Sequence, residues 1–362
     1  MKVSETRIAP AEGDLALWRE LFPLPSVFLD IETMGLSKTY APVYLVGLLY
    51  QTPEGPVLAQ YLADNPSDER RMLKAALDKV AEFDTVITFN GDTFDLPFLE
   101  YRAQKLRLTN FPKRESVDLY RRFAPYCKAF GLTNRKLKTL EEFLGIYRED
   151  PFTGGQLIEL YDEYSATGDA RLEKVILLHN FEDIANMPAL LRMEGFARAL
   201  RTAAVTSASY EGDGRLLFTL EKPLPLAPAF CVGDADVCIA DDRRTLAWQL
   251  PVGEGELCYF LPTYKDYYFL PEQGKIVHTS LAGAIPASAR RKAKANECYL
   301  VRRGRFVKMP PQVAEAVCTA GGLRAYRADY ADKNVYFSEE ELVRYFAEKT
   351  EGGLDCWIRR MM

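Results

Sequence analysis

Three short acidic segments, far apart in the chain, place the strongest constraint on its fold. They are VFLDIETMGL (27–36), TFNGDTFDLPFL (88–99) and HNFEDIANM (179–187). In the first segment the alternation of a β-strand puts Asp30 and Glu32 on the same face. Neighbouring carboxylates repel each other, and burying them against a sheet is costly unless they share a cation. The segment therefore predicts a divalent metal ion beside a buried strand.

The second acidic segment follows an apolar run at 85–89 that predicts another buried strand. An Asn-Gly-Asp sequence then supplies turn residues. Asp95 stands directly before a Leu-Pro pair and an amphipathic stretch, where the N-cap or a first-turn residue of a helix belongs. Taken alone, Asp95 fits a plain helix cap as well as it fits a metal ligand.

The third acidic segment lies inside a predicted long helix at 170–201. His179 and Asp183 interrupt its apolar stripe and are four residues apart, so they share one face of the helix. Taken alone, His179 fits a core histidine and Asp183 a surface acid, just as an acidic pair on a strand is more often solvated or salt-bridged. Only the order and the context of the three segments together favour a joint metal site.

In order and in local context, the segments resemble the three exonuclease motifs of the DEDD branch of the ribonuclease H-like superfamily, and most closely the bacterial YprB-type family. The resemblance spans about residues 20 to 200 and includes VDLYRRF (117–123) and LKTLEEFLGIYRED (137–150). It implies a mixed sheet with flanking helices and a nucleic-acid substrate. The residues implied as metal ligands are Asp30, Glu32, Asp95 and Asp183, and those implied as substrate contacts are Thr33, Met34, Asn90 and Phe94.

The chain departs from this family pattern at two positions. Met34 follows the Asp-x-Glu-Thr of the first motif, where a threonine is usual, which alters the expected contact to the terminal nucleotide. In the third motif the family carries either a tyrosine that three residues separate from the aspartate, or a histidine that four residues separate from it. His179 takes the tyrosine spacing to Asp183, and Glu182 is an alternative ligand if the helix is rotated.

The residues suit the hydrolysis of phosphodiester bonds. Carboxylate ligands favour hard cations, so we expect Mg²⁺ or Mn²⁺, and two ions about 4 Å apart can activate water and stabilise the leaving oxygen. His179 would orient the attacking water or accept its proton, because imidazole titrates near neutral pH. The predicted catalytic residues are Asp30, Glu32, Asp95, His179 and Asp183.

These expectations together predict a metal-dependent nuclease, a 3′-5′ exonuclease acting on single-stranded DNA or RNA. The alternative is a catalytically weak or inactive nucleic-acid-binding or scaffold protein that retains the fold. A further alternative is a proofreading-like module whose C-terminal domain docks on a protein partner.

The order of predicted elements indicates an α/β domain. A strand at 26–32 and apolar runs at 43–50 and 57–62 predict an antiparallel meander, followed by the first crossover helix at 67–82. Together with the strand at 85–89, they predict a mixed sheet with helices packed on it.

A second domain is predicted after 202–215, where the composition turns small and polar. Short β-prone runs and a helix at 338–348 follow. We therefore expect a ribonuclease H-like domain at 1–205 and a smaller β-rich C-terminal domain of unknown role at 206–362.

Composition agrees with a cytoplasmic protein that does not contact a membrane. The 362-residue chain has no apolar run long enough to cross a bilayer, and its seven cysteines include no Cys-x-x-Cys pair, which favours reduced thiols. The net charge of −5 argues against a general nucleic-acid binder. Two basic groups nevertheless offer contacts to a phosphate backbone, with solvated surface as the alternative in each case. The first includes Arg102 and Lys105, and the second runs from Arg290 to Lys308.

Overall fold

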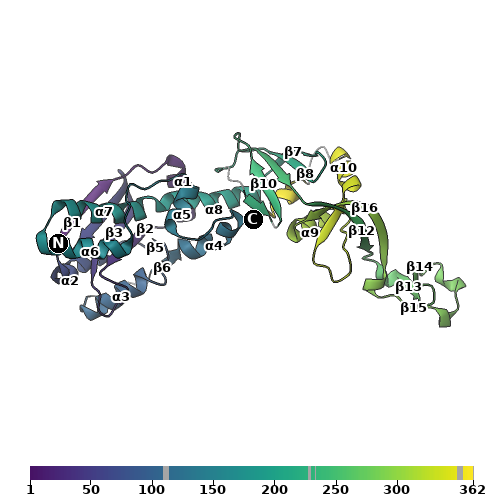
Figure 1. The fold of residues 1–362 in the computed structure, drawn as a ribbon, viewed down its shortest axis with the longest axis horizontal. Coiled ribbons are helices and arrows are strands. Elements are labelled where there is room, and N and C mark those ends of the chain that lie inside the picture. The colour runs from purple at the N-terminus through teal and green to yellow at the C-terminus, as the bar shows by residue number, and fades with distance from the viewer. Residues whose placement is uncertain (109–113, 227–229, 233, 349–353, 362) are drawn as a thin grey trace. The chain divides into compact units, whose positions relative to one another are not determined.

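The computed structural model describes residues 1–108, 114–226, 230–232, 234–348 and 354–361. The chain forms two compact units, Met1–Gly195 and Phe196–Met362 (Figure 1). The division falls within a helix, α8 Met187–Thr202. The domain bounds 1–205 and 206–362 remain a prediction.

The first unit is built on a six-stranded mixed sheet in the order β1-β4-β3-β2-β5-β6. Strands β2, β3 and β4 pair antiparallel, which confirms the predicted meander, whereas β5 pairs parallel with both β2 and β6. The central position of β2 makes it buried on both faces. The strands are β1 Lys2–Arg7, β2 Ser26–Thr33, β3 Val43–Thr52, β4 Gly55–Leu62, β5 Thr85–Thr88 and β6 Glu115–Asp118.

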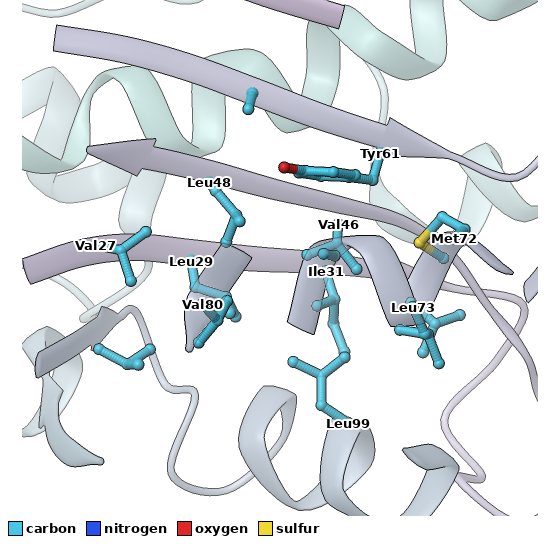
Figure 2. Packing of buried hydrophobic residues seen from close by; sticks show 14 of the residues in the cluster. Val27, Leu29, Ile31, Val46, Leu48, Tyr61, Met72, Leu73, Val80 and Leu99 are labelled. Atoms are coloured by element: carbon cyan, nitrogen blue, oxygen red, sulfur yellow. The ribbon is translucent and has the colours of Figure 1, made fainter. Parts of the chain in front are cut away.

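Helices cover both faces of this sheet. On one face, side chains from β2, β3 and β4 pack against the helices α2 and α3 in a buried apolar cluster, which includes Val27, Leu29 and Ile31 (Figure 2). On the other face Tyr44 of β3 stacks on Tyr161 of α6, with ring centroids 4.0 Å apart, and Ile176 of α7 is buried beside them. The helices are α1 Glu12–Leu21, α2 Glu69–Val80, α3 Asp95–Lys105, α4 Leu119–Ala129, α5 Leu137–Phe143, α6 Gly154–Thr167, α7 Ala170–Ala185 and α8 Met187–Thr202.

The single long helix predicted at 170–201 is wrong, because the structure has two helices there, α7 and α8. Asn186 is the C-cap of α7, and Pro188 is the second residue of α8. Proline has no backbone N–H to donate to the preceding turn, so it interrupts the hydrogen-bond ladder of a helix at this point. The break falls just after Asp183, which stays in the last turn of α7.

The second unit is β-rich, as predicted, and its described residues form a five-stranded sheet and two three-stranded sheets. The predicted helix at 338–348 is α10. The strands are β7 Val205–Tyr210, β8 Arg215–Leu220, β9 Phe230–Val232, β10 Ala235–Ile239, β11 Thr245–Gln249, β12 Val252–Phe260, β13 Tyr267–Leu270, β14 Lys275–His278, β15 Arg291–Lys292, β16 Tyr299–Met309 and β17 Val335–Ser338, and the helices are α9 Pro311–Thr319, α10 Glu339–Glu348 and α11 Asp355–Ile358.

Several cations of the basic group between Arg290 and Lys308 have acidic partners in this unit. Arg302 pairs with Glu341 at 2.8 Å and with Glu340 at 2.6 Å. The other pairs are Arg291 with Glu297, Arg305 with Glu339 and Asp213, and Lys308 with Asp234. These partners offset much of the positive charge on which a phosphate contact would depend. Within the described residues, no helix combines the length and the apolar character that crossing a bilayer requires.

Candidate functional site

Strand β2 presents Asp30 and Glu32 on the face of the sheet that α7 covers. The approach of α7 depends on Gly47, which lies opposite Asp30 in β3. A Cβ atom at Gly47 would lie 2.1 Å from Cδ1 of Ile184 and 2.3 Å from Oδ1 of Asn180. Because glycine lacks this atom, the Nδ2 of Asn180 reaches Oδ2 of Asp30 at 2.9 Å. The amide thus orients one of the two strand carboxylates.

Asp95 reaches the same strand from the start of α3. Its Oδ1 accepts a hydrogen bond of 3.2 Å from the backbone N–H of Ile31, the residue between Asp30 and Glu32. The side chain is buried. Asp95 thus takes the predicted first-turn position, after the N-cap Phe94, and it brings a third carboxylate to the strand that carries the first two.

Helix α7 supplies the remaining members of the cluster. Nε2 of His179 lies 3.3 Å from Oδ2 of Asp183 and 3.7 Å from Oε1 of Glu32. One possible ligand atom from each of these three residues lies within 4.8 Å of the other two, so the trio could hold a metal ion. The carboxylate of Glu182 points elsewhere, since it accepts the backbone N–H groups of Glu149 at 2.8 Å and Asp150 at 2.9 Å. The rotation of the helix thus brings Asp183, rather than Glu182, to the carboxylates of β2.

The cluster carries negative charge that burial makes unfavourable. Burial, followed by repulsion from Asp183 and Asp95, raises the pKa of Asp30 and of Glu32 well above their usual ranges. Burial also raises the pKa of Asp95 to about 7, although the backbone N–H of Ile31 opposes the rise. Buried carboxylates that repel one another are stabilised either by binding protons or by sharing a cation. Their hard oxygen atoms suit a divalent ion such as Mg²⁺ or Mn²⁺.

Two further residues, which the sequence interpretation did not single out, contact the cluster. Nη1 of Arg148 lies 2.5 Å from Oδ1 of Asp183, and its Nε lies 2.5 Å from Oε2 of the buried Glu141. Oδ2 of Asp150 lies 2.6 Å from Nδ1 of His179. Arg148 and Asp150 stand in the GIYRED part of a motif used for the resemblance, but an irregular segment has no periodicity that would reveal which way its side chains point.

The four predicted substrate contacts lie in two places. Thr33 is buried and its Oγ1 donates to the backbone oxygen of Gly35 at 2.8 Å, and Met34 packs beside both apolar clusters of the sheet. Asn90 is exposed, with a φ of 66° that asparagine tolerates, and Phe94 packs on Phe98 with ring centroids 5.3 Å apart. Their role in substrate binding remains a prediction.

The raised pKa values predict how the stability of the metal-free protein depends on pH. A carboxyl group whose pKa is higher in the folded than in the unfolded chain stabilises the fold below about pH 4, and this contribution disappears as the pH rises through the folded pKa. For Asp95 that pKa is about 7. We therefore expect Mg²⁺ or Mn²⁺ to raise the melting temperature clearly at about pH 8 and little at about pH 5, because the ion replaces protons.

Differential scanning fluorimetry at both pH values, with sodium chloride at matched ionic strength, measures this effect. In Asp95→Asn the ion-dependent rise at about pH 8 should shrink, because one carboxylate is lost. An equal rise at both pH values would contradict the coupling of ion binding to these carboxyl groups.

Comparisons with known proteins match the first unit. Residues 27–193 match the sequence model of a family described as the RNase_H superfamily, which confirms the ribonuclease H-like fold class. The chain is 36% identical over 110 residues to a DNA polymerase of Pyrococcus glycovorans, with 27% of this chain and 13% of that protein covered. It is 32% identical over 109 residues to a DNA polymerase of Thermococcus aggregans, with 28% of this chain and 6% of that protein covered.

Among solved structures, the family B DNA polymerase of Pyrobaculum calidifontis matches 49% of this chain and 26% of its own, at 20% sequence identity and a TM-score of 0.40. The chain thus spans only a small part of the length of these relatives. Membership of the narrower YprB-type family remains a prediction.

Proposed function

We propose that this chain, whose residues 27–193 match the ribonuclease H superfamily, is a metal-dependent nuclease that hydrolyses phosphodiester bonds. The observation that carries the proposal is the meeting of carboxylates from three distant segments, where burial and then mutual repulsion raise the pKa values of Asp30 and Glu32, and burial raises the pKa of Asp95. Similarity to DNA polymerases supports a nucleic-acid substrate.

In this proposal Asp30, Glu32, Asp95 and Asp183 hold the ions. With Mg²⁺ or Mn²⁺ bound there, the site would gain an activated water and a positive charge that stabilises the attacked phosphate and the leaving oxygen. The amide of Asn180 and the backbone N–H of Ile31 orient two of the carboxylates by hydrogen bonds of 2.9 Å and 3.2 Å. Nε2 of His179 faces the same cluster and would accept a proton from the attacking water.

The finer proposal is a 3′-5′ exonuclease that acts on single-stranded DNA or RNA. The order and context of the acidic segments support this, because they resemble exonuclease motifs. A protein partner for a C-terminal domain at 206–362 and a cytoplasmic location belong to the same proposal.

One observation favours a second candidate, an inactive nucleic-acid-binding or scaffold protein with the same fold. The guanidinium of Arg148 pairs with Oδ1 of Asp183 at 2.5 Å and thereby places a cation of the protein itself beside one of the four proposed ligands. In a nuclease, Asp183 would bind an ion through Oδ2, which faces Nε2 of His179 at 3.3 Å, while Arg148 keeps its contact to Glu141.

Incubation with end-labelled single- and double-stranded DNA and RNA, with Mn²⁺ or with a chelator, tests the proposal. We expect a single-stranded substrate labelled at its 5′ end to shorten in steps, and one labelled at its 3′ end to release the label at once. Neither should occur with the chelator. Titration calorimetry with Mn²⁺ separates the two candidates, because no hydrolysis together with no ion binding would favour the inactive protein.

A further inference from the structure

Asp150 and His179 form a buried pair on the side of the imidazole that points away from the carboxylate cluster. Oδ2 of Asp150 lies 2.6 Å from Nδ1 of His179, and both side chains are buried. The other ring nitrogen, Nε2, faces Glu32 and Asp183 at 3.7 Å and 3.3 Å. The two ring nitrogens therefore have different partners. Nε2 faces carboxylates of the proposed catalytic cluster, whereas Nδ1 contacts Asp150, which lies outside that cluster.

The segment that carries Asp150 is held against α7 by its backbone. The carboxylate of Glu182 accepts the N–H groups of Glu149 and Asp150 at 2.8 Å and 2.9 Å. Oδ1 of Asp150 in turn accepts the N–H of Phe152 at 3.2 Å, which leaves Oδ2 for the ring. Two residues of one helix, Glu182 and His179, thus contact the same short segment. The position of Asp150 relative to His179 is therefore fixed by backbone hydrogen bonds as well as by the contact between the two side chains.

We propose that Asp150 is a positioning residue that keeps the proton of neutral His179 on Nδ1 and holds the ring so that the lone pair of Nε2 faces Glu32 and Asp183. The inference rests on the proposed function, because it explains how this histidine can serve the hydrolysis. A carboxylate can only accept at Nδ1, so it selects the tautomer in which Nδ1 donates. In that tautomer Nε2 is free to accept a proton from water or to bind an ion.

The same tautomer is needed whether His179 acts as a base or as a metal ligand. Histidines that bind metal ions usually donate their other ring N–H to a carboxylate or carbonyl, which fixes both the tautomer and the orientation of the ring. Loss of such a partner typically lowers activity or affinity about 10- to 100-fold. The role of Asp150 is therefore separable from the exact role of the histidine.

The chain allows a direct measurement, because His179 and His278 are its only histidines. His278 lies in the second unit, is exposed and contacts the hydroxyl of Ser280 at 2.7 Å through Nδ1. Proton-nitrogen correlation spectra of the full chain with ¹⁵N-labelled histidine then contain two rings, and His278→Gln identifies the signals of His179. We expect a protonated Nδ1 and an unprotonated Nε2 for His179, in metal-free protein at a pH where both rings are neutral.

Asp150→Asn is the informative variant. Its side-chain oxygen can still accept the N–H of Phe152, but its amide can donate to Nδ1 and so favours the opposite tautomer. We expect the His179 ring to shift to the Nε2-protonated form. We also expect kcat with Mg²⁺ to fall about 10- to 100-fold with little change in KM. In a His179→Ala background the same substitution should have almost no further effect, because a positioning residue acts through the ring.

Asp169→Asn serves as the matched control. Asp169 caps the N-terminus of the same helix, where asparagine is about as effective a cap. It should leave the tautomer and kcat unchanged.

The outcomes separate the two ideas. A wild-type His179 protonated on Nε2, or a tautomer that Asp150→Asn does not change, would overturn the positioning role even if the protein hydrolyses nucleic acid. The expected tautomer in a protein that hydrolyses none of the substrates would support the positioning of the ring and overturn the proposed nuclease. Because the spectrum with Asp150 intact needs only the exposed His278→Gln variant for its assignment, a failure of Asp150→Asn to fold would not prevent the test.

Discussion

Asp30→Asn is expected to abolish metal-dependent release of nucleotides while the protein stays folded. The substitution removes one carboxylate from the proposed ion site but keeps the shape of the side chain. Its oxygen can still accept the hydrogen bond of 2.9 Å from Nδ2 of Asn180. Loss of partners that merely support metal ligands costs about 10- to 100-fold, so loss of a ligand should cost more than about 100-fold.

The same substitution should not destabilise the metal-free protein. Burial, together with repulsion from Asp183, Asp95 and Glu32, raises the pKa of Asp30, so its charged form is unfavourable in the fold. A neutral amide removes that repulsion, and at about pH 8 we expect an unchanged or higher melting temperature without added ions. A loss of activity with a gain of stability distinguishes a functional carboxylate from a structural one.

Initial rates with Mg²⁺ and with Mn²⁺, and melting temperatures with a chelator, measure both effects. Asp78→Asn is the matched control, because Asp78 is exposed on α2 and pairs only with Lys74 among the contacts described for it. It should change neither quantity. Activity of Asp30→Asn near the wild-type level would remove the nuclease proposal.

Arg102→Met is expected to lower the free energy of unfolding by about 3–5 kcal/mol. Arg102 and Glu69 form a buried pair, with side-chain exposures of 6% and 4%, in which Nε of Arg102 donates to Oε1 of Glu69 at 2.7 Å. The same Glu69 oxygen accepts the backbone N–H of Val43 at 2.9 Å. Removing the guanidinium leaves a buried carboxylate without its counter-charge, which is costly because water cannot replace the lost partner.

This pair connects three elements that position the site. Glu69 begins α2, Arg102 lies in α3 two turns after Asp95, and Val43 begins β3. The basic residue that the sequence suggested as a guide for nucleic acid is thus an internal contact. Lys105 is exposed, and its Nζ donates to the backbone oxygen of Thr39 at 2.6 Å.

Urea unfolding followed by far-ultraviolet circular dichroism measures the loss. Lys74→Met breaks an exposed pair, with side-chain exposures of 59% and 57%, and should cost less than about 1 kcal/mol. Adding Glu69→Gln to Arg102→Met should recover part of the loss, because the buried charge is then removed. A loss below about 1 kcal/mol in Arg102→Met would show that the pair contributes little.

Local patterns in the sequence predicted much of the first unit. The alternation in 27–32 predicted that Asp30 and Glu32 share a face, and the structure has a strand, β2, at Ser26–Thr33. The spacing of four residues predicted that His179 and Asp183 lie together on a helix, and their side chains approach to 3.3 Å. Both predictions depend on periods of two and 3.6 residues, which a chain segment has before it meets any other segment.

The prediction of one long helix is wrong because the apolar stripe continues past Asn186, although Pro188 has no N–H to extend the hydrogen-bond ladder of α7. Tertiary packing then accommodated two helices where the pattern suggested one.

The sequence by itself determined which acids are available and which of them are neighbours within one strand or one helix, because those relations follow from local backbone geometry. Only the tertiary structure decided which side chains face these acids. Arg148 reaches Asp183, and Asp150 reaches His179 across 29 positions of the chain. Asn180 reaches Asp30 across 150 positions, and does so because Gly47 leaves room for the helix. Contacts of this kind depend on how α7 packs against the sheet and on the path of an irregular segment, and neither is recorded in any local period of the sequence.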